Sequence, residues 1–226
     1  MEESLEYLLN YKVRVSGIIF KLDPDNKEKR ILTVQENSLY GLPGGKLPVL
    51  CMKKTKDMLD LFITKNKERL HNKLEEEKGK FTTEKEIIQN TDNEELRSGL
   101  ESELYEELGL SRRKEEKIHI KNITPYTIYI EKLYSDNGIL INPVYFVEYN
   151  IDYTVEIANP DIFIFYLEER KRSRNIKDYK LGSPLEITSQ NYNDTFEHSV
   201  NRVCIKLQED NLLNGKKSRK STKLVP

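Results

Sequence analysis

Residues 94–110, EELRSGLESELYEELGL, are the most informative stretch of this chain. On the helix that they predict, Glu106 and Glu107 lie three and four residues after Glu103, so these three glutamates project from one side. Like charges at this spacing repel one another and destabilise a helix slightly, which a bound divalent cation would offset. Mg²⁺ takes oxygen ligands, and it combines one or two carboxylates with waters and phosphate oxygens. The helix is therefore a candidate metal-binding element, and Glu94 is a fourth carboxylate that approaches the same region.

A solvated helix face is the simpler explanation, because the chain has 38 acidic residues. Two neighbouring sequence features favour a functional role for this helix instead. Residues 40–46, YGLPGGK, form the densest glycine cluster of the sequence, and the helix ends at Leu108-Gly109-Leu110. Glycines this close together allow the backbone to turn sharply or to approach another group.

These residues resemble the sequence motif of the Nudix hydrolases. The family pattern is Gly, five residues, Glu, seven residues, Arg-Glu, an apolar residue, any residue, Glu-Glu, any residue, Gly and an apolar residue. Here Glu94 and the seven residues after it lead into SELYEELGL, so every element from Glu94 onward matches except the arginine, which is Ser102. Gly45 resembles the first glycine of the motif, and residues 12–21 and 30–35 resemble the first two core strands.

The resemblance implies an α/β fold, a Nudix-type α/β/α sandwich around a mixed β-sheet. Residues 1–212 are then one domain, with a helical insertion at about 48–92 in place of the five-residue gap of the motif. A long surface insertion is tolerated because loop-closure entropy grows only with the logarithm of loop length. Residues 213–226 are expected to form a basic, disordered tail.

The resemblance also implies the site. Glu103, Glu106 and Glu107 resemble the ligands of Mg²⁺ or Mn²⁺, and Glu94 resembles an accessory catalytic carboxylate. Gly45 shapes the turn against this helix together with the preceding glycine, and Lys46 is positioned to reach a substrate phosphate. The implied reaction is attack by water on a phosphorus atom of a nucleoside diphosphate linked to another moiety. A nucleotide, a nucleotide sugar, a dinucleoside polyphosphate and a capped RNA 5′ end all satisfy this description.

Ser102 leaves three alternatives open, because serine cannot form the charge-assisted, bidentate contact of an arginine. Another basic group replaces the arginine, the site binds metal weakly, or catalysis is lost. In the last case the chain is a catalytically silent module that binds a nucleotide, RNA or a protein partner. The helix predicted at 52–80 is a candidate surface for such a protein. The general base stays open among Glu156, Glu168 and Glu169.

The remaining elements follow from local patterns. Residues 12–21 and 30–35 predict a hairpin, and residues 118–123, 126–134 and 139–151 predict strands, the last two joined by a turn at 135–138. Thr83 and Glu86 predict a capping box for a short helix, and Asp92 is the predicted cap of the helix that ends before Gly109. Residues 157–167 are a mixed apolar segment, residues 168–174 a charged loop and residues 184–209 mainly helix.

Composition limits the function classes. With 37 basic and 38 acidic residues, the net charge of -1 argues against a surface built throughout for nucleic acid or anionic lipid. RNA stays a candidate partner through two short basic runs, at 170–174 and 216–220, and Tyr40, Tyr126 and Tyr129 are candidates for base stacking. Two cysteines cannot form a disulfide framework, and neither a signal peptide nor a membrane span is expected. A cytoplasmic protein is the expectation.

Overall fold

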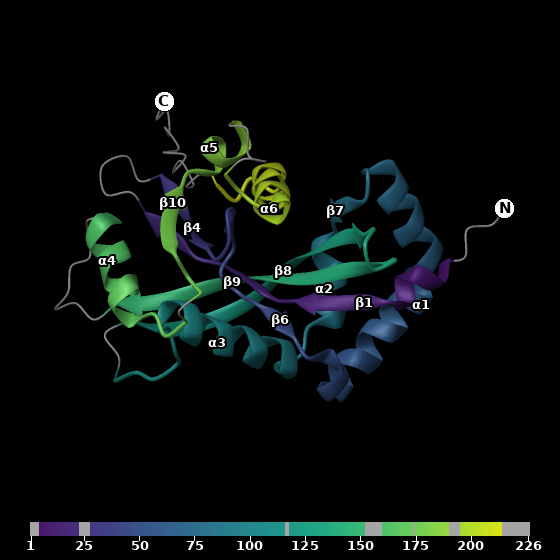
Figure 1. The fold of residues 1–226 in the computed structure, drawn as a ribbon, viewed down its shortest axis with the longest axis horizontal. Helices are drawn as coiled ribbons and strands as arrows, with labels where there is room; N and C mark the ends of the chain where they lie inside the picture. The colour runs from purple at the N-terminus through teal and green to yellow at the C-terminus, as the bar shows by residue number, and fades with distance from the viewer. Residues whose placement is uncertain are drawn as a thin grey trace, which may run out of the picture.

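The computed structural model describes residues 5–22, 28–115, 118–151, 160–173, 175–189 and 195–213. In this part of the chain, a six-stranded mixed sheet has the order β6-β1-β9-β8-β7, with β2 also paired to β9. A four-stranded sheet has the order β10-β4-β3, with β5 paired to β4. Helices lie on either side of the sheets (Figure 1). The predicted α/β architecture with a mixed sheet is confirmed.

The strands are β1 (Tyr11–Arg14), β2 (Ser16–Ile18), β3 (Phe20–Leu22), β4 (Lys29–Gln35), β5 (Tyr40–Gly41), β6 (Lys46–Leu47), β7 (Lys80–Thr82), β8 (Ile118–Leu133), β9 (Gly138–Ile151) and β10 (Asp178–Gly182). The helices are α1 (Lys53–Glu76), α2 (Lys85–Thr91), α3 (Glu94–Leu108), α4 (Pro160–Arg170), α5 (Pro184–Ser189) and α6 (His198–Glu209). Two short 3-10 helices, Leu5–Leu9 and Val49–Cys51, complete the described elements.

The first predicted strand serves both sheets. Within residues 12–21, β1 and β2 pair in parallel with β9, whereas β3 pairs with β4 in the smaller sheet. The predicted hairpin is therefore correct only where residues 20–22 pair with residues 29–31. The chain crosses between the sheets near Ile19, whose carbonyl accepts a hydrogen bond from the amide of Leu32.

The long hairpin β8–β9 is the centre of the larger sheet. The turn after β8 lies where the Asp-Asn-Gly sequence predicts it, and Asn137 takes the left-handed conformation with φ of 44°. Two predicted strands, at 118–123 and 126–134, form the single strand β8, which has register shifts at 120–122 and 125–127. The break that the sequence indicates around Pro125 is thus absorbed as an irregularity within one strand.

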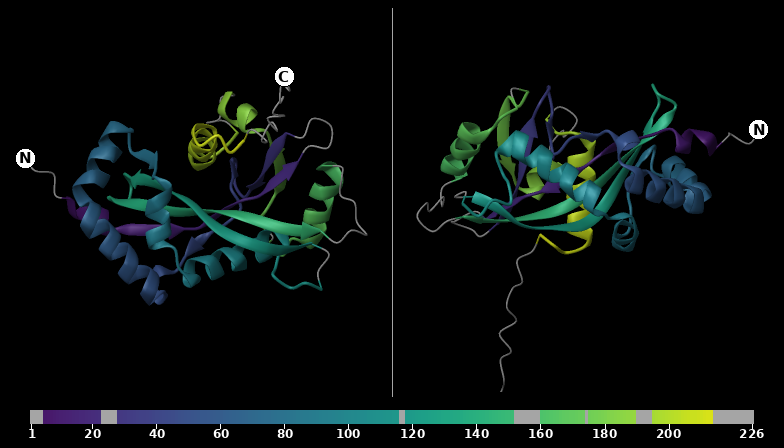
Figure 2. Two further views of the ribbon diagram at one scale, coloured as in Figure 1. Left: turned by 180° about the vertical axis from the view of Figure 1, so that it is seen from behind. Right: turned by 90° about the horizontal axis from the view of Figure 1, so that it is seen from below.

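Helix α3 covers one face of the larger sheet, and α5 and α6 lie on the opposite side (Figure 2). Four leucines spaced four residues apart bury the inner side of α3: Leu96, Leu100, Leu104 and Leu108. A Cβ atom on Gly17 of β2 would lie at ordinary contact distance, 3.6 and 3.7 Å, from two of these leucines, but only 2.9 Å from Val147 Cγ2 in β9.

Both ends of α3 are defined by local hydrogen bonds. The N-cap is Asn93, whose side chain accepts from the Leu96 amide at 3.1 Å, and the predicted cap Asp92 pairs instead with Arg97. Asn and Asp are comparable N-caps, so the sequence did not separate the two neighbours. At the C-terminus, Gly109 adopts φ of 65° and ends the helix as predicted.

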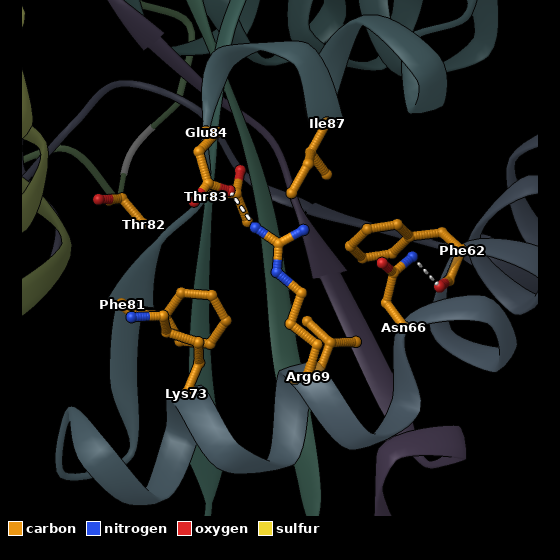
Figure 3. A pocket seen from close by; sticks show the side chains of 10 residues that line it. Phe62, Asn66, Arg69, Lys73, Phe81, Thr82, Thr83, Glu84 and Ile87 are labelled. Carbon is orange, nitrogen blue, oxygen red and sulfur yellow. Dashed lines mark hydrogen bonds and ion pairs between the residues drawn. The ribbon is translucent and has the colours of Figure 1, made fainter.

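The segment predicted as a helical insertion contains α1, β7 and α2. The predicted apolar stripe of α1 is buried as expected: Leu59, Phe62, Ile63, Leu70 and Leu74. The segment is not purely helical, because β7 adds an edge strand beside β8. Thr83 is not a helix cap. Its hydroxyl accepts from the Ile128 amide at 3.1 Å, and α2 begins after Glu84 without a side-chain cap. A small pocket opens between α1, β7 and α2, and none of the predicted site residues lines it (Figure 3).

The C-terminal region differs from the sequence prediction in three places. The first part of the predicted charged loop, through Arg170, belongs to α4. The strand β10 was not predicted, although it pairs along its full length with β4. Phe196 lies outside the final helix and forms an isolated bridge with Tyr40. Glu156, Arg174 and residues 214–226 of the basic tail predicted at 213–226 lie outside the described residues. The extent of a single domain at 1–212 stays a prediction.

Within the described residues, none of the helices is both long and apolar enough to span a bilayer.

Candidate active site

The glycine turn at residues 43–45 is fastened to the junction of β1 and β2. The amide of Val15 donates to the Gly45 carbonyl at 3.0 Å, and the amide of Gly17 donates to the Pro43 carbonyl at 2.8 Å. Gly44 has φ of 137°, and a Cβ atom there would lie 2.0 Å from the Val15 carbonyl oxygen. Only glycine fits this conformation at this distance. The turn is therefore held in one conformation beside the C-terminal half of α3.

The side chain of Glu107 extends from α3 to this glycine turn. Its side chain is only 3% exposed, and its Oε2 accepts a hydrogen bond from the Gly44 amide at 2.7 Å. Its second oxygen, Oε1, is buried and has no hydrogen-bond partner. Burial raises the pKa of this carboxyl to about 8, against the opposing effects of the Gly44 amide and of Arg14. A buried carboxylate with one unpartnered oxygen is the kind of group that a cation stabilises.

Glu103 lies one turn earlier on the same side of the helix. A Cβ atom on Gly45 would meet its Oε2 at 2.1 Å, so this glycine leaves the space that the carboxylate occupies. Burial raises the pKa of Glu103, the charge of Glu106 raises it further, and Arg14 lowers it. Glu36, at the end of β4, acts on both Glu103 and Glu107 as a further negative charge.

The side chain of Glu106 is exposed, and its main-chain carbonyl binds the loop after α4. Its carbonyl accepts from the amides of Arg172 and Ser173, each at 2.8 Å. The Arg172 guanidinium lies over the Tyr105 ring, 4.2 Å from its centroid. The loop after α4 is thereby held against the end of the glutamate helix, so the first basic run borders the site.

Glu94 and Lys46 lie farther from this group. Glu94 is exposed in the first turn of α3, and the nine residues to Glu103 correspond to about 13 Å along the helix axis. Lys46 is exposed in β6, and its charge acts on Asp136 in the β8–β9 turn. The structure thus brings Glu103 and Glu107 together at the glycine turn, with Glu106 beside them.

Several residues of this region were not predicted from the sequence. Arg14 of β1 reaches the turn, and Glu197, at the N-terminus of α6, places a carboxylate oxygen 3.8 Å from the Arg14 guanidinium. A Cβ atom on Gly41 would meet the same carboxylate at 2.8 Å. The Tyr179 hydroxyl of β10 donates to the Glu107 carbonyl at 2.5 Å. No local pattern marks Arg14, because β1 has the sequence Tyr-Lys-Val-Arg, and the other contacts depend on tertiary structure.

The candidate general bases and the candidate stacking tyrosines differ in their exposure to solvent. Glu168 and Glu169 are exposed on α4, and the charge of Glu168 acts on the Tyr179 hydroxyl. Tyr126 and Tyr129 are 1% and 0% exposed within the core, so they are not available for base stacking. Tyr40 is half-buried, and its hydroxyl donates to Asp178.

Metal binding fits some of these residues. Among the residues that the structure describes, no three His, Cys, Asp or Glu side chains are arranged to hold a metal ion. The unpartnered Glu107 oxygen and the neighbouring Glu103 carboxylate nevertheless supply the hard oxygen donors that Mg²⁺ and Mn²⁺ prefer. The three-glutamate site therefore stays a prediction, of which two members adjoin the same glycine turn.

Comparison with known proteins gives solved structures at low sequence identity. A NUDIX hydrolase from Nitrosomonas europaea is 15% identical with a TM-score of 0.44, over 88% of this chain and 89% of that one. A MutT NUDIX hydrolase from Burkholderia pseudomallei is 14% identical with a TM-score of 0.41, over 87% and 96%. The NUDIX domain of Shewanella oneidensis NrtR, complexed with ADP ribose, is 12% identical with a TM-score of 0.39, over 87% of both chains. No family model and no curated protein sequence matches. At these identities and TM-scores, the likeness assigns neither a substrate nor an activity to this chain.

Proposed function

We propose that this chain is a metal-dependent Nudix-type pyrophosphohydrolase, which cleaves a nucleoside diphosphate linked to another moiety. The observation that carries the proposal is the Glu107 carboxyl, which is buried against the Gly44 amide with its second oxygen unpartnered. A protein that used this helix only as a solvated face would expose that carboxylate. Burying it with one oxygen unpartnered costs free energy, so a role in binding a cation explains its position.

Glu103 and Glu107 would hold Mg²⁺ or Mn²⁺, with Glu106 as the exposed third carboxylate. When bound, the metal would neutralise diphosphate charge and lower the pKa of the attacking water. The residues of the chain prepare this site without the metal. The Gly44 amide fixes the Glu107 carboxylate, and Gly45 leaves room for Glu103 beside it. Arg14 lowers the pKa of both carboxyls and so opposes the effect of their burial.

The proposed partners are nucleoside diphosphate derivatives. A capped RNA 5′ end is one member of this class, and the Arg172 side of the α4–β10 loop is a basic surface beside the site that supports it. We place the enzyme in the cytoplasm, in keeping with two free cysteines, Cys51 and Cys204.

A substrate panel tests this function. Purified protein with Mg²⁺ or Mn²⁺ would be offered ADP-ribose, a nucleotide sugar, a diadenosine polyphosphate, deoxynucleoside triphosphates and m7G-capped RNA, and products would be separated and quantified. Glu107→Gln should lower turnover at least about 100-fold, because even partners of metal ligands are worth 10- to 100-fold. Glu101→Gln on the same helix is the matched control, since Glu101 pairs with Arg112 outside the site. Full activity of Glu107→Gln would contradict the assignment.

A catalytically silent module is the second candidate. It is favoured by Ser102, which is exposed where the motif has an arginine, and by the absence of a ready three-ligand cluster among the described side chains. Binding of a panel compound without turnover, with equal affinity in the Glu107→Gln variant, would support this module over the enzyme.

A further inference from the structure

Strand β1 places a guanidinium beside the glycine turn. Arg14 is the last residue of β1, its side chain is only 17% exposed, and its guanidinium contacts the Gly44 carbonyl. Ser102, by contrast, is exposed on α3. The positive charge that the helix itself lacks therefore enters the site from the sheet.

Arg14 and Glu107 hold the same residue from its two ends. The guanidinium Nη2 of Arg14 donates to the Gly44 carbonyl at 3.2 Å, while the Gly44 amide donates to Glu107 Oε2 at 2.7 Å. One peptide segment thus connects the guanidinium to the carboxylate. A shift of Gly44 at its carbonyl would therefore also move the amide from which Glu107 accepts.

Glu197 holds the other side of the guanidinium. Its Oε1 lies 3.8 Å from Arg14 Nη1, and its backbone is fixed because its amide donates to the Tyr40 carbonyl at 2.9 Å. The Ser199 hydroxyl donates to the second carboxylate oxygen at 3.3 Å. A planar guanidinium with donors on two edges can serve the Gly44 carbonyl and Glu197 at once, which a lysine ammonium cannot do in the same geometry.

The charges that surround this guanidinium come from four elements. Glu103 and Glu107 belong to α3, Glu36 follows β4, and Glu197 precedes α6. Lys46 is the register partner of Arg14 in β6, but its charge acts on Asp136 at the β8–β9 turn. Arg14 is therefore surrounded by acidic side chains from three elements, with Lys46 as its cross-strand neighbour in β6.

We propose that Arg14 is the positioning residue of this site, which holds the Gly44 turn and the carboxylates of Glu103 and Glu107 in place from β1. Arg14 then does from the sheet what Ser102 cannot do from the helix. The inference rests on the proposed function for its catalytic meaning, but the contact between Arg14, Gly44 and Glu107 can be tested in the metal-free protein.

Positioning and simple charge balance predict opposite signs for metal affinity. If Arg14 contributes only a positive charge, replacing it with a neutral residue removes repulsion toward Mn²⁺, and Mn²⁺ binds more tightly. If Arg14 positions the carboxylates, the same replacement leaves them misplaced, and Mn²⁺ binds more weakly. A similarly long apolar side chain, Arg14→Met, separates the two.

The experiment compares Arg14→Met, Arg14→Lys and the control Lys12→Met. Lys12 lies on the same strand and makes its own exposed ion pair with Asp136 at 2.8 Å, away from the glycine turn. Two quantities are measured: Mn²⁺ affinity by calorimetry, and hydrogen exchange of the Gly44 amide without metal. Arg14→Met should weaken Mn²⁺ binding about 10- to 100-fold and accelerate Gly44 exchange, as expected for partners of metal ligands. Arg14→Lys should fall between Arg14→Met and the wild type, and Lys12→Met should match the wild type.

Equal or tighter Mn²⁺ binding by Arg14→Met, or unchanged Gly44 exchange, would overturn the proposal. If Arg14→Met does not fold, Glu197→Gln replaces it, because it leaves Arg14 in place but removes its charged partner; accelerated Gly44 exchange supports the proposal and unchanged exchange overturns it. Ser102→Arg in the wild type should change kcat less than about twofold, since the site already has its guanidinium. A tenfold gain in kcat would overturn the proposal. Absence of Mn²⁺ binding in the wild type would instead refute the proposed function, whereas Gly44 exchange would still decide the role of Arg14.

Discussion

Helices α1 and α3 are both rich in charged residues, but they use these charges in opposite ways. On α1, Lys56 pairs with Asp60 at 2.5 Å, and Lys73 pairs with Glu76 at 3.4 Å, with side chains that are open to solvent. On α3, the side chains of Glu103 and Glu107 lie against the glycine turn, and one oxygen of Glu107 has no hydrogen-bond partner. Exposed pairs contribute little to stability, whereas a buried unpartnered carboxylate destabilises the fold. Two helices of similar charged composition therefore differ in function according to what packs beside them. A candidate ligand-binding site forms where the charged side chains face another segment of the chain, and a solvated face forms where they face water.

The largest effect is expected from comparing two glycines, one in each region. Gly45→Ala would place a Cβ atom 2.1 Å from Glu103 Oε2. Because that oxygen ends a flexible side chain, the carboxylate moves and the fold survives. Misplacement by about 1 Å should lower turnover on the order of 100-fold. Gly79→Ala, at φ of 83° after α1, should instead destabilise the protein by about 1 kcal/mol with normal turnover. Equal effects of both substitutions on turnover would remove the distinction between the regions.

The next effect is a pH dependence of stability that Glu107 causes. Its pKa is raised from 4.5 to about 8 in the folded state, so the folded protein binds this proton more tightly than the unfolded chain. The resulting stabilisation is complete below pH 4.5 and is lost as the pH rises to about 8, at up to about 1.4 kcal/mol per pH unit.

Thermal unfolding in EDTA between pH 5 and pH 8 measures this dependence. The wild type should lose stability relative to Glu107→Gln over that range, because Gln does not titrate. Parallel curves for the two proteins would mean that Glu107 ionises normally.

A smaller effect separates the two ends of α3. Glu94→Gln should reduce turnover by less than about twofold, because some 13 Å of helix separates it from Glu103. It should also lower the free energy of unfolding by about 0.5 kcal/mol, because Glu94 interacts favourably with the helix N-terminus. Steady-state kinetics beside Glu103→Gln checks this. A loss with Glu94→Gln as large as with Glu103→Gln would show that substrate binding brings Glu94 to the site.

The sequence predicted the parts of the fold that depend on local chemistry. The αL end of α3 at Gly109, the turn at Asn137 and the buried stripe of α1 follow from residue type and spacing alone. The sequence did not predict the division of residues 12–21 between two sheets, the pairing of β10 with β4 or the capping of α3 by Asn93. Each of these depends on which partners the chain meets in three dimensions. In the site, spacing identified Glu103 and Glu107, but Arg14 and Glu197 come from segments 89 or more residues from Glu103, and no local pattern connects them.

Calorimetric titration with Mn²⁺ at pH 7, in buffers of different ionisation enthalpy, measures whether Glu107 is a metal ligand. Metal binding to a carboxyl that is protonated at this pH releases its proton, and the proton appears as a buffer-dependent heat. We predict Mn²⁺ binding with release of close to one proton in the wild type, and loss of both signals in Glu107→Gln. Undiminished Mn²⁺ binding by Glu107→Gln, or no binding by the wild type, would contradict the assignment of Glu107 as a metal ligand.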